Sequence, residues 1–254
     1  MSFKFHLPVA VSMMVLSAAV ALGAPMLLNE YNGVKDGGFI KDGGTDTYFG
    51  TVDGNGGDWM EFVIVQDNLD IRGWSFVTYQ DGAYDGRITL PSLDTLGSLR
   101  SGTVFTIAEL VATDLSYSPV FDEGNPAAGD WWINYQAAFS DGNSTHKDFQ
   151  VTILDAMDNV IFGPAGEGTS LSSGIGNDEV FKLEADPSDL ITALSPYYND
   201  GTSSTFGSPN KWSKGTITQD FSQLRRNAAV PEPATLAYLL AGLPALSVIR
   251  RRRK

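Results

Sequence analysis

Short apolar runs, each ended within a few residues by Gly, Asp, Asn or Ser, recur along most of this chain. Runs of about four to eight residues between turn-forming residues are typical of β-strands, whereas helices show longer apolar patterns with a period of about 3.6 residues. The sequence therefore predicts an all-β fold, and nine such runs favour a sandwich of two sheets. They cover residues 26–31, 59–66, 71–79, 87–90, 103–109, 131–137, 148–154, 160–163 and 179–184. Short helices are expected at 94–99 and 188–194.

The C-terminal end combines a Pro-Glu-Pro motif, an apolar run over 234–249 and a basic tail. As a helix, this run would reach about 24 Å, which is short of the roughly 30 Å hydrocarbon core of a bilayer. Clustered cations are retained on the cytoplasmic side of a membrane, so the residues before the run are expected to lie outside. The motif is Pro231, Glu232 and Pro233, and the tail is Arg250, Arg251, Arg252, Arg253 and Lys254.

The N-terminal residues independently predict export. Lys4 precedes an apolar stretch over 7–22, and small residues follow at Ala19, Ala21 and Ala24. These are the parts of a secretory signal peptide, so we expect the export machinery to remove residues 1–24.

The C-terminal features together resemble the PEP-CTERM sorting signal of bacterial envelope proteins. The resemblance implies transient membrane insertion of the helix and recognition by an exosortase, a membrane transpeptidase that cleaves near the Pro-Glu-Pro motif. An ordinary tail anchor is the alternative. The expected order is a signal peptide (1–24), one domain (25–212), a linker (213–229) and the sorting signal (230–254).

The charge of the processed chain excludes several partners. Processing would remove six of the 17 basic residues and one of the 30 acidic residues, which leaves a net charge of −18. Such a chain lacks the cations that neutralise phosphates, so neither nucleic acid nor an anionic membrane surface is expected as a partner. Cysteine is absent and only His146 would remain as an imidazole. Thiolate catalysis, disulfides and zinc sites with several histidines are therefore excluded.

Three motifs, in this order, resemble the lamin-tail domain, an immunoglobulin-like β-sandwich. They lie at 27–31, 58–62 and 69–76, and weaker similarity at 148–159 and 206–210 extends the resemblance over about 26–212. The resemblance implies a lamin-tail-like sandwich with long loops, in which buried carboxylates pin strand ends, and it makes 31–57 an inserted surface loop. The residues expected to serve the fold are Asn29, Glu30, Trp59, Glu61, Asp70, Gly73 and Trp74.

Signals for catalysis are weak in this sequence. His146 lies in a polar loop, and the Gly-x-Ser-x-Gly elbow that presents a nucleophilic serine is missing. Glycoside hydrolysis needs only two suitably spaced carboxylates, so a secreted hydrolase of polysaccharide or phosphodiester stays an alternative.

Acidic, glycine-rich loops make calcium the metal to consider, because it takes several oxygen ligands from flexible loops. Asp53, Asn55 and Asp58 are the candidate ligands, although tight β-turns select the same residue types. Trp131 and Trp132, or Trp212 near 197–198, could form aromatic platforms for a saccharide, with core packing as the alternative.

The sequence thus predicts an exported, non-enzymatic β-sandwich with a binding or structural role in the envelope, at the outer surface or in the extracellular matrix. An extracellular polysaccharide is the candidate partner beside the exosortase. A secreted hydrolase and a calcium-binding surface adhesion module are the alternatives.

Overall fold

The computed structural model describes residues 23–119, 128–139, 145, 148–167 and 176–227, and this part of the chain is mostly β-sheet. Its larger sheet has six strands in the order β11-β10-β1-β3-β6-β7, antiparallel except for the parallel pair β6 and β7. The strands are β1 (Met26–Asn32), β3 (Trp59–Ile64), β6 (Val104–Ala108), β7 (Trp132–Gln136), β10 (Val180–Leu183) and β11 (Tyr198–Gly201).

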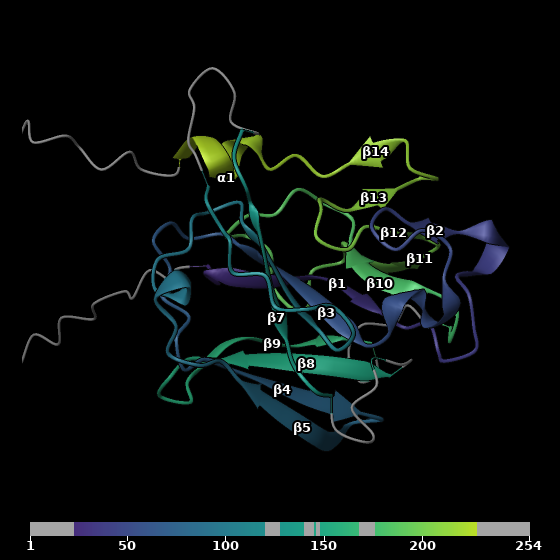
Figure 1. Cartoon of the computed structure of the whole chain (residues 1–254), viewed down its shortest axis with the longest axis horizontal. Coiled ribbons are helices and arrows are strands. Elements are labelled where there is room, and N and C mark those ends of the chain that lie inside the picture. The colour runs from purple at the N-terminus through teal and green to yellow at the C-terminus, as the bar shows by residue number, and fades with distance from the viewer. Residues whose placement is uncertain (1–22, 120–127, 140–144, 146–147, 168–175, 228–254) are drawn as a thin grey trace, which may run out of the picture.

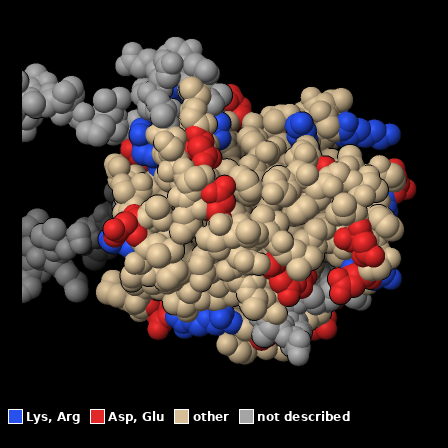
Figure 2. Space-filling model, viewed as in Figure 1, with Lys and Arg blue, Asp and Glu red and all other residues tan. Residues whose placement is uncertain are grey.

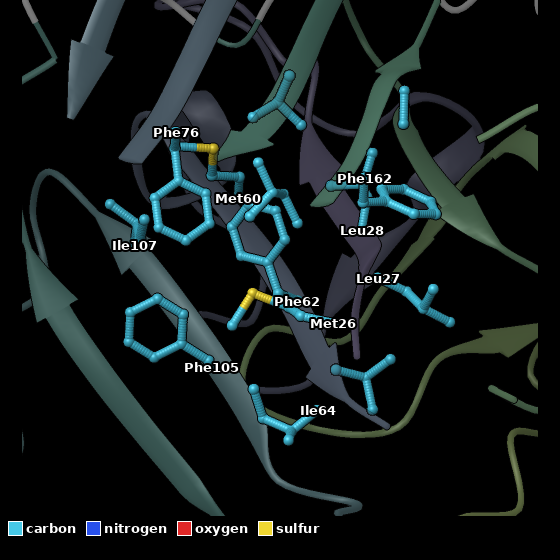
Figure 3. Close-up of a cluster of buried hydrophobic side chains, with 14 of the residues drawn as sticks. Met26, Leu27, Leu28, Met60, Phe62, Ile64, Phe76, Phe105, Ile107 and Phe162 are labelled. Carbon is cyan, nitrogen blue, oxygen red and sulfur yellow. The ribbon is translucent and has the colours of Figure 1, made fainter. Parts of the chain in front are cut away.

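The smaller sheet has four antiparallel strands in the order β5-β4-β8-β9, and it packs face to face with the larger one (Figure 1). The strands are β4 (Ser75–Gln80), β5 (Ala83–Thr89), β8 (Phe149–Leu154) and β9 (Val160–Gly166). Aromatic rings join the two inner faces: Phe62 lies 4.7 Å from Phe76, and Tyr31 lies 4.9 Å from Phe149, between ring centroids. Figure 3 shows the methionine, leucine and phenylalanine side chains that fill this interior. The expected all-β fold of two packed sheets is therefore present.

A third, irregular layer covers the six-stranded sheet on the side away from β4 and β5 (Figure 1). It contains the parallel pair β2 (Thr45–Asp46) and β12 (Ser203–Ser204), the hairpin of β13 (Lys211–Trp212) and β14 (Ile217–Thr218), and helix α1 (Ser222–Asn227). The short 3-10 helices are η1 (Lys41–Gly43), η2 (Asp53–Gly56) and η3 (Asp94–Leu96).

All nine expected strands are present, with shifted ends. The strand expected from residue 71 begins at Ser75, because Gly73 adopts a left-handed φ of 73° in a turn closed by a hydrogen bond from Trp74 N to Ile71 O. The helix expected at 188–194 is absent: the segment forms turns, and Ser188 Oγ accepts a single weak hydrogen bond from Leu190 N.

Two segments expected to be irregular and exposed belong to the folded body. In the expected linker, Gln219 and Phe221 are only 4% and 3% exposed. In the expected surface loop, Ile40, Asp46 and Asn55 are buried. Within the described residues, no helix is long and apolar enough to cross a membrane.

Candidate functional site

Five polar side chains form a continuous row across the outer face of the six-stranded sheet. Neighbouring strands place them directly opposite one another, so the row runs through β10, β1, β3, β6 and β7. Every member is at most 1% exposed, although this face would meet water in a two-layer sandwich. The polar row consists of Lys182, Glu30, Glu61, Thr106 and Asn134.

A β-bulge at Asn29 places the first carboxylate in the row. The register of β1 against β3 shifts between Leu28, which pairs with Phe62, and Glu30, which pairs with Glu61. Strict alternation would put Leu28 and Glu30 on the same face, and Glu30 would then enter the apolar interior. The extra residue reverses the side on which the chain continues, so Glu30 faces outward beside Glu61.

Residues 203–219, which we call the C-terminal clasp, cover the polar row and satisfy its charges. Thr205 donates to Glu30 from its hydroxyl at 2.7 Å and from its backbone N at 3.3 Å. Gly207 N donates to Glu61 Oε2 at 2.7 Å, while Asn29 Nδ2 donates to Glu61 Oε1 at 2.7 Å. Lys182 Nζ donates to the carbonyl oxygens of Ser203, at 2.5 Å, and Lys211, at 2.8 Å.

A third buried carboxylate, Asp46 in β2, holds the clasp from its other side. Its Oδ2 accepts from Ser204 Oγ at 2.5 Å and from Phe206 N at 3.0 Å. At the far end of the clasp, Gln219 Nε2 donates to Asn29 Oδ1 at 2.9 Å. Carboxylates and amides of the first sixty residues therefore bind the last part of the described fold.

Aromatic rings seal the clasp beside the row. The ring of Phe206 lies 4.9 Å from that of Phe49, 5.2 Å from Trp59 and 5.7 Å from Trp132. Gly207 is required here, because its φ is 73° and a Cβ would lie 2.9 Å from the indole of Trp132. The carboxylates of the row are thereby screened from water.

Burial changes the titration of the charged members. It raises the pKa of Glu30 to about 7, with Lys182 acting in the opposite direction. Burial, followed by the negative charge of Glu30, raises the pKa of Glu61 well above its usual range. Burial also lowers the pKa of Lys182. The pKa values of all three shift toward the neutral form, as expected for charges held away from water.

The structure brings only some of the expected fold residues together. Asn29, Glu30 and Glu61 join in the network, and Trp59 packs beside them. The others lie at the start of β4: Asp70 forms an ion pair with Arg72, Gly73 forms the turn, and Trp74 is buried in the interior.

Sequence reasoning missed most partners of these carboxylates. Asp46 occurs in a glycine-rich loop typical of turns, Lys182 is a lone cation within an apolar strand, and Gln219 falls in a polar stretch. A signal was available for Lys182, because a buried cation inside a strand needs an acidic neighbour.

Each of the three proposed calcium ligands forms hydrogen bonds with a different part of the chain. Asp53 Oδ1 accepts from Gly37 N at 2.7 Å, and Asp58 Oδ1 accepts from Thr145 N at 2.9 Å. Asn55 is 1% exposed, and its Nδ2 donates to Ser204 Oγ at 3.1 Å. Across the described ranges, no group of three His, Asp or Glu side chains is placed to share a metal ion.

Trp131 and Trp132 do not form an open platform, whereas Trp212 is half-buried and Tyr197 is 51% exposed. Trp131 is 5% exposed, and the Arg225 guanidinium carbon lies 4.9 Å from the centroid of its ring. Trp132 is half-buried against Phe206, and its Nε1 donates to Thr106 Oγ1 at 3.0 Å. Tyr198 is buried, with its hydroxyl bonded to Leu28 O.

Several expected sites lie outside the described residues. These are His146, most of the signal peptide (1–22) and the whole sorting signal, including Pro231, Glu232, Pro233 and the tail from Arg250 to Lys254. Comparison of the chain with protein-family models, with curated proteins and with solved structures gives no match.

Proposed function

We propose that this chain is an exported protein of the bacterial envelope, outer surface or extracellular matrix, with a non-catalytic binding or structural body. The body is an immunoglobulin-like, lamin-tail-like sandwich, delivered with a PEP-CTERM type of sorting signal that an exosortase processes. The observation that carries the non-catalytic role is the engagement of the clustered carboxylates. Glu30, Glu61 and Asp46 all accept hydrogen bonds from the clasp and are at most 3% exposed.

Helix α1 lies beside the start of the proposed mature chain. Pro25 lines the same groove, of about 470 Å³, as Gln223 and Leu224. Helix α1 is held to the body there, because Ser101 Oγ donates to Leu224 O at 2.7 Å and Arg225 stacks on Trp131. Helix α1 ends at Asn227, and the proposed processing site at 231–233 follows it in the sequence.

Mass spectrometry of the mature C-terminus tests this proposal. In cells that contain an exosortase, the chain is expected to end near Pro231 and to lack the basic tail. A chain in which Pro231, Glu232 and Pro233 are all replaced by alanine should keep Lys254, whereas Glu184→Ala, a carboxylate change on the body, should be processed normally. A wild-type chain that retains Lys254 in such cells would instead be a tail-anchored protein.

One observation favours the rival function, a secreted hydrolase. Three carboxylates converge, and Glu30 has a pKa of about 7, which suits a general acid. In a hydrolase, the clasp would have to open to admit substrate. Hydrolysis of a polysaccharide or phosphodiester by the wild-type chain, abolished in Glu61→Gln, would replace the binding role with this one.

A further inference from the structure

A groove of about 600 Å³, lined by threonine, serine, glycine, lysine and aspartate residues, lies against the outer side of the clasp. Three segments line it: 42–47 around β2, 202–205 at the start of the clasp, and 211–215 in the β13–β14 hairpin. The volume falls within the range of about 300–1,000 Å³ that is common for small-molecule sites. Six of the lining residues carry hydroxyl groups: Thr45, Thr47, Thr202, Ser203, Ser204 and Thr205.

Two ammonium groups border this groove without an acidic partner. Neither Lys211 nor Lys214 forms an ion pair within the described part of the chain, and Asp42 is the one carboxylate among the described lining residues. Figure 2 shows cationic side chains over the β13–β14 hairpin on a surface with scattered acidic groups. Four other cations, Lys41, Arg72, Arg87 and Arg100, are paired with carboxylates, whereas Lys35, Arg225 and Arg226 also form no ion pair within the described residues. The net charge of −13 repels anions at long range, so an anionic ligand at this groove would depend on the two lysines close by.

The hairpin holds one of these lysines in a strained conformation. Ser213 and Lys214 have φ values of 51° and 60°, followed by Gly215 at 80°. Side chains other than glycine and asparagine adopt this left-handed conformation at a cost. Strained positions of this kind concentrate at functional sites. Three of the eight described non-glycine residues with a left-handed φ, Asp42, Ser213 and Lys214, lie in the segments that line the groove.

Hydroxyl groups remain available for a ligand. Ser203, Ser204 and Thr205 use theirs within the clasp network. The hydroxyls of Thr47 and Thr202 form no hydrogen bond within the described residues, and both line the groove. A sugar chain that carries carboxylates offers both the hydroxyls and the negative charges that such a wall accepts.

We propose that this groove binds an acidic oligosaccharide. The ammonium groups of Lys211 and Lys214 face its carboxylates, while Thr47 and Thr202 bond to its hydroxyls. The inference rests on the proposed binding role and names its ligand class. It makes the clasp a scaffold for the site, because Lys211 O and Ser203 O are fixed together by the buried Lys182.

Isothermal titration of the purified full chain, kept in detergent, with a trisaccharide of galacturonate tests the proposal. The neutral galactose trisaccharide is the comparison ligand, and binding of the acidic one should be tighter and should weaken with added salt. Lys211→Gln and Lys214→Gln are each expected to weaken binding by about threefold, as for exposed ion pairs. Lys35→Gln, the same charge change at an exposed lysine elsewhere, should leave binding unchanged, and Asp42→Asn should strengthen it.

Lys214→Gly separates binding from folding. The glycine relieves the left-handed strain, so the melting temperature should hold or rise while galacturonate binding falls. A sulfated galactose trisaccharide shows whether sulfate serves as well as carboxylate.

Equal binding of the neutral and acidic trisaccharides, equal weakening by Lys35→Gln, or no binding at millimolar concentration would overturn the proposal. Such a failure is distinct from a failure of the sorting proposal, because the mass of the mature C-terminus is measured independently of any ligand.

Discussion

The two faces of the six-stranded sheet are buried to the same degree by opposite chemistry. On the inner face, Tyr31, Phe62 and Phe105 are 0% exposed and pack against aromatic and aliphatic side chains of the other sheet. On the outer face, Glu30 and Glu61 are also 0% exposed, but they face donors on a covering segment. Along the strands, successive side chains alternate between the inner and the outer face, and in β1 the β-bulge at Asn29 interrupts this alternation.

The difference shows that the two faces of one sheet can differ in how strictly they select the segment that covers them. Apolar burial is non-directional, so the inner face accepts any complementary apolar surface. A buried carboxylate is tolerated only when donors meet it in the right geometry, so the outer face accepts a specific segment. The inner face supplies most of the stability, whereas the outer face selects what covers it.

Removal of a large inner side chain should have the greatest effect. Phe62→Ala leaves a cavity between the sheets and is expected to lower the free energy of unfolding by about 3–5 kcal/mol, measured by urea denaturation. Hydrogen exchange should speed up in both sheets. Tyr84→Ala, at a side chain that is 67% exposed, is the control and should change stability by less than about 0.5 kcal/mol.

Removal of an outer carboxylate should act locally. Glu61→Ala leaves the donors on Asn29 and Gly207 without their acceptor, at an expected cost of about 1–3 kcal/mol, partly offset by lost repulsion from Glu30. Hydrogen exchange should accelerate in 203–219 while β4 and β8 stay protected. Uniform acceleration in both sheets would show that the two faces do not differ in the way proposed.

The outer face should also make stability depend on pH. The folded-state pKa of Glu30, about 7, lies above its reference of 4.5, so the folded chain holds this proton more tightly. Stability should therefore fall as pH rises from about 4.5 to 7, by roughly 1–3 kcal/mol. Glu30→Gln should flatten this slope in urea titrations, whereas Glu184→Gln should not.

Three surface aspartates determine how stability changes at the acidic end of the pH range. Hydrogen bonds hold the pKa values of Asp70, Asp155 and Asp220 below 3.8, so their contribution is lost only as pH falls below that value. An optimum near pH 4–5 follows. A stability that rises steadily from pH 5 to 8 would contradict the raised pKa of Glu30 in the folded chain.

The sequence predicts which side chains form the inner face, but it does not predict which segment covers the outer face. Alternation at Met60, Phe62 and Ile64 identifies the buried side of β3, because periodicity is a local property. A role in the fold for Asn29, Glu30 and Glu61 is predicted only by the resemblance to the lamin-tail domain. Their partners Thr205, Gly207 and Gln219 lie 146 to 190 residues away, and no local pattern joins them.

The smallest effect is expected from calcium. Asp53, Asn55 and Asp58 already bond to Gly37, Ser204 and Thr145, so we expect millimolar calcium to shift the melting temperature by less than about 1 °C relative to chelator. A rise of several degrees, lost in Asp58→Asn, would identify a calcium site at 53–58.

The hydrogen bond between Asn29 and Gln219 also sets the order in which the fold can be completed. These two side chains are separated by 190 residues, which makes their contact among the slowest kind for a chain to form. As the polypeptide emerges from N- to C-terminus, the first strand can pair with β3 early, and Tyr31 can be buried once Phe149 and Phe181 have been made. Its acidic side stays exposed to water until the clasp has also been made. A product that stops at residue 202 would therefore have all six strands but would present Glu30 and Glu61 on an uncovered face. The covering of the first strand thus reports that nearly the whole domain has been made.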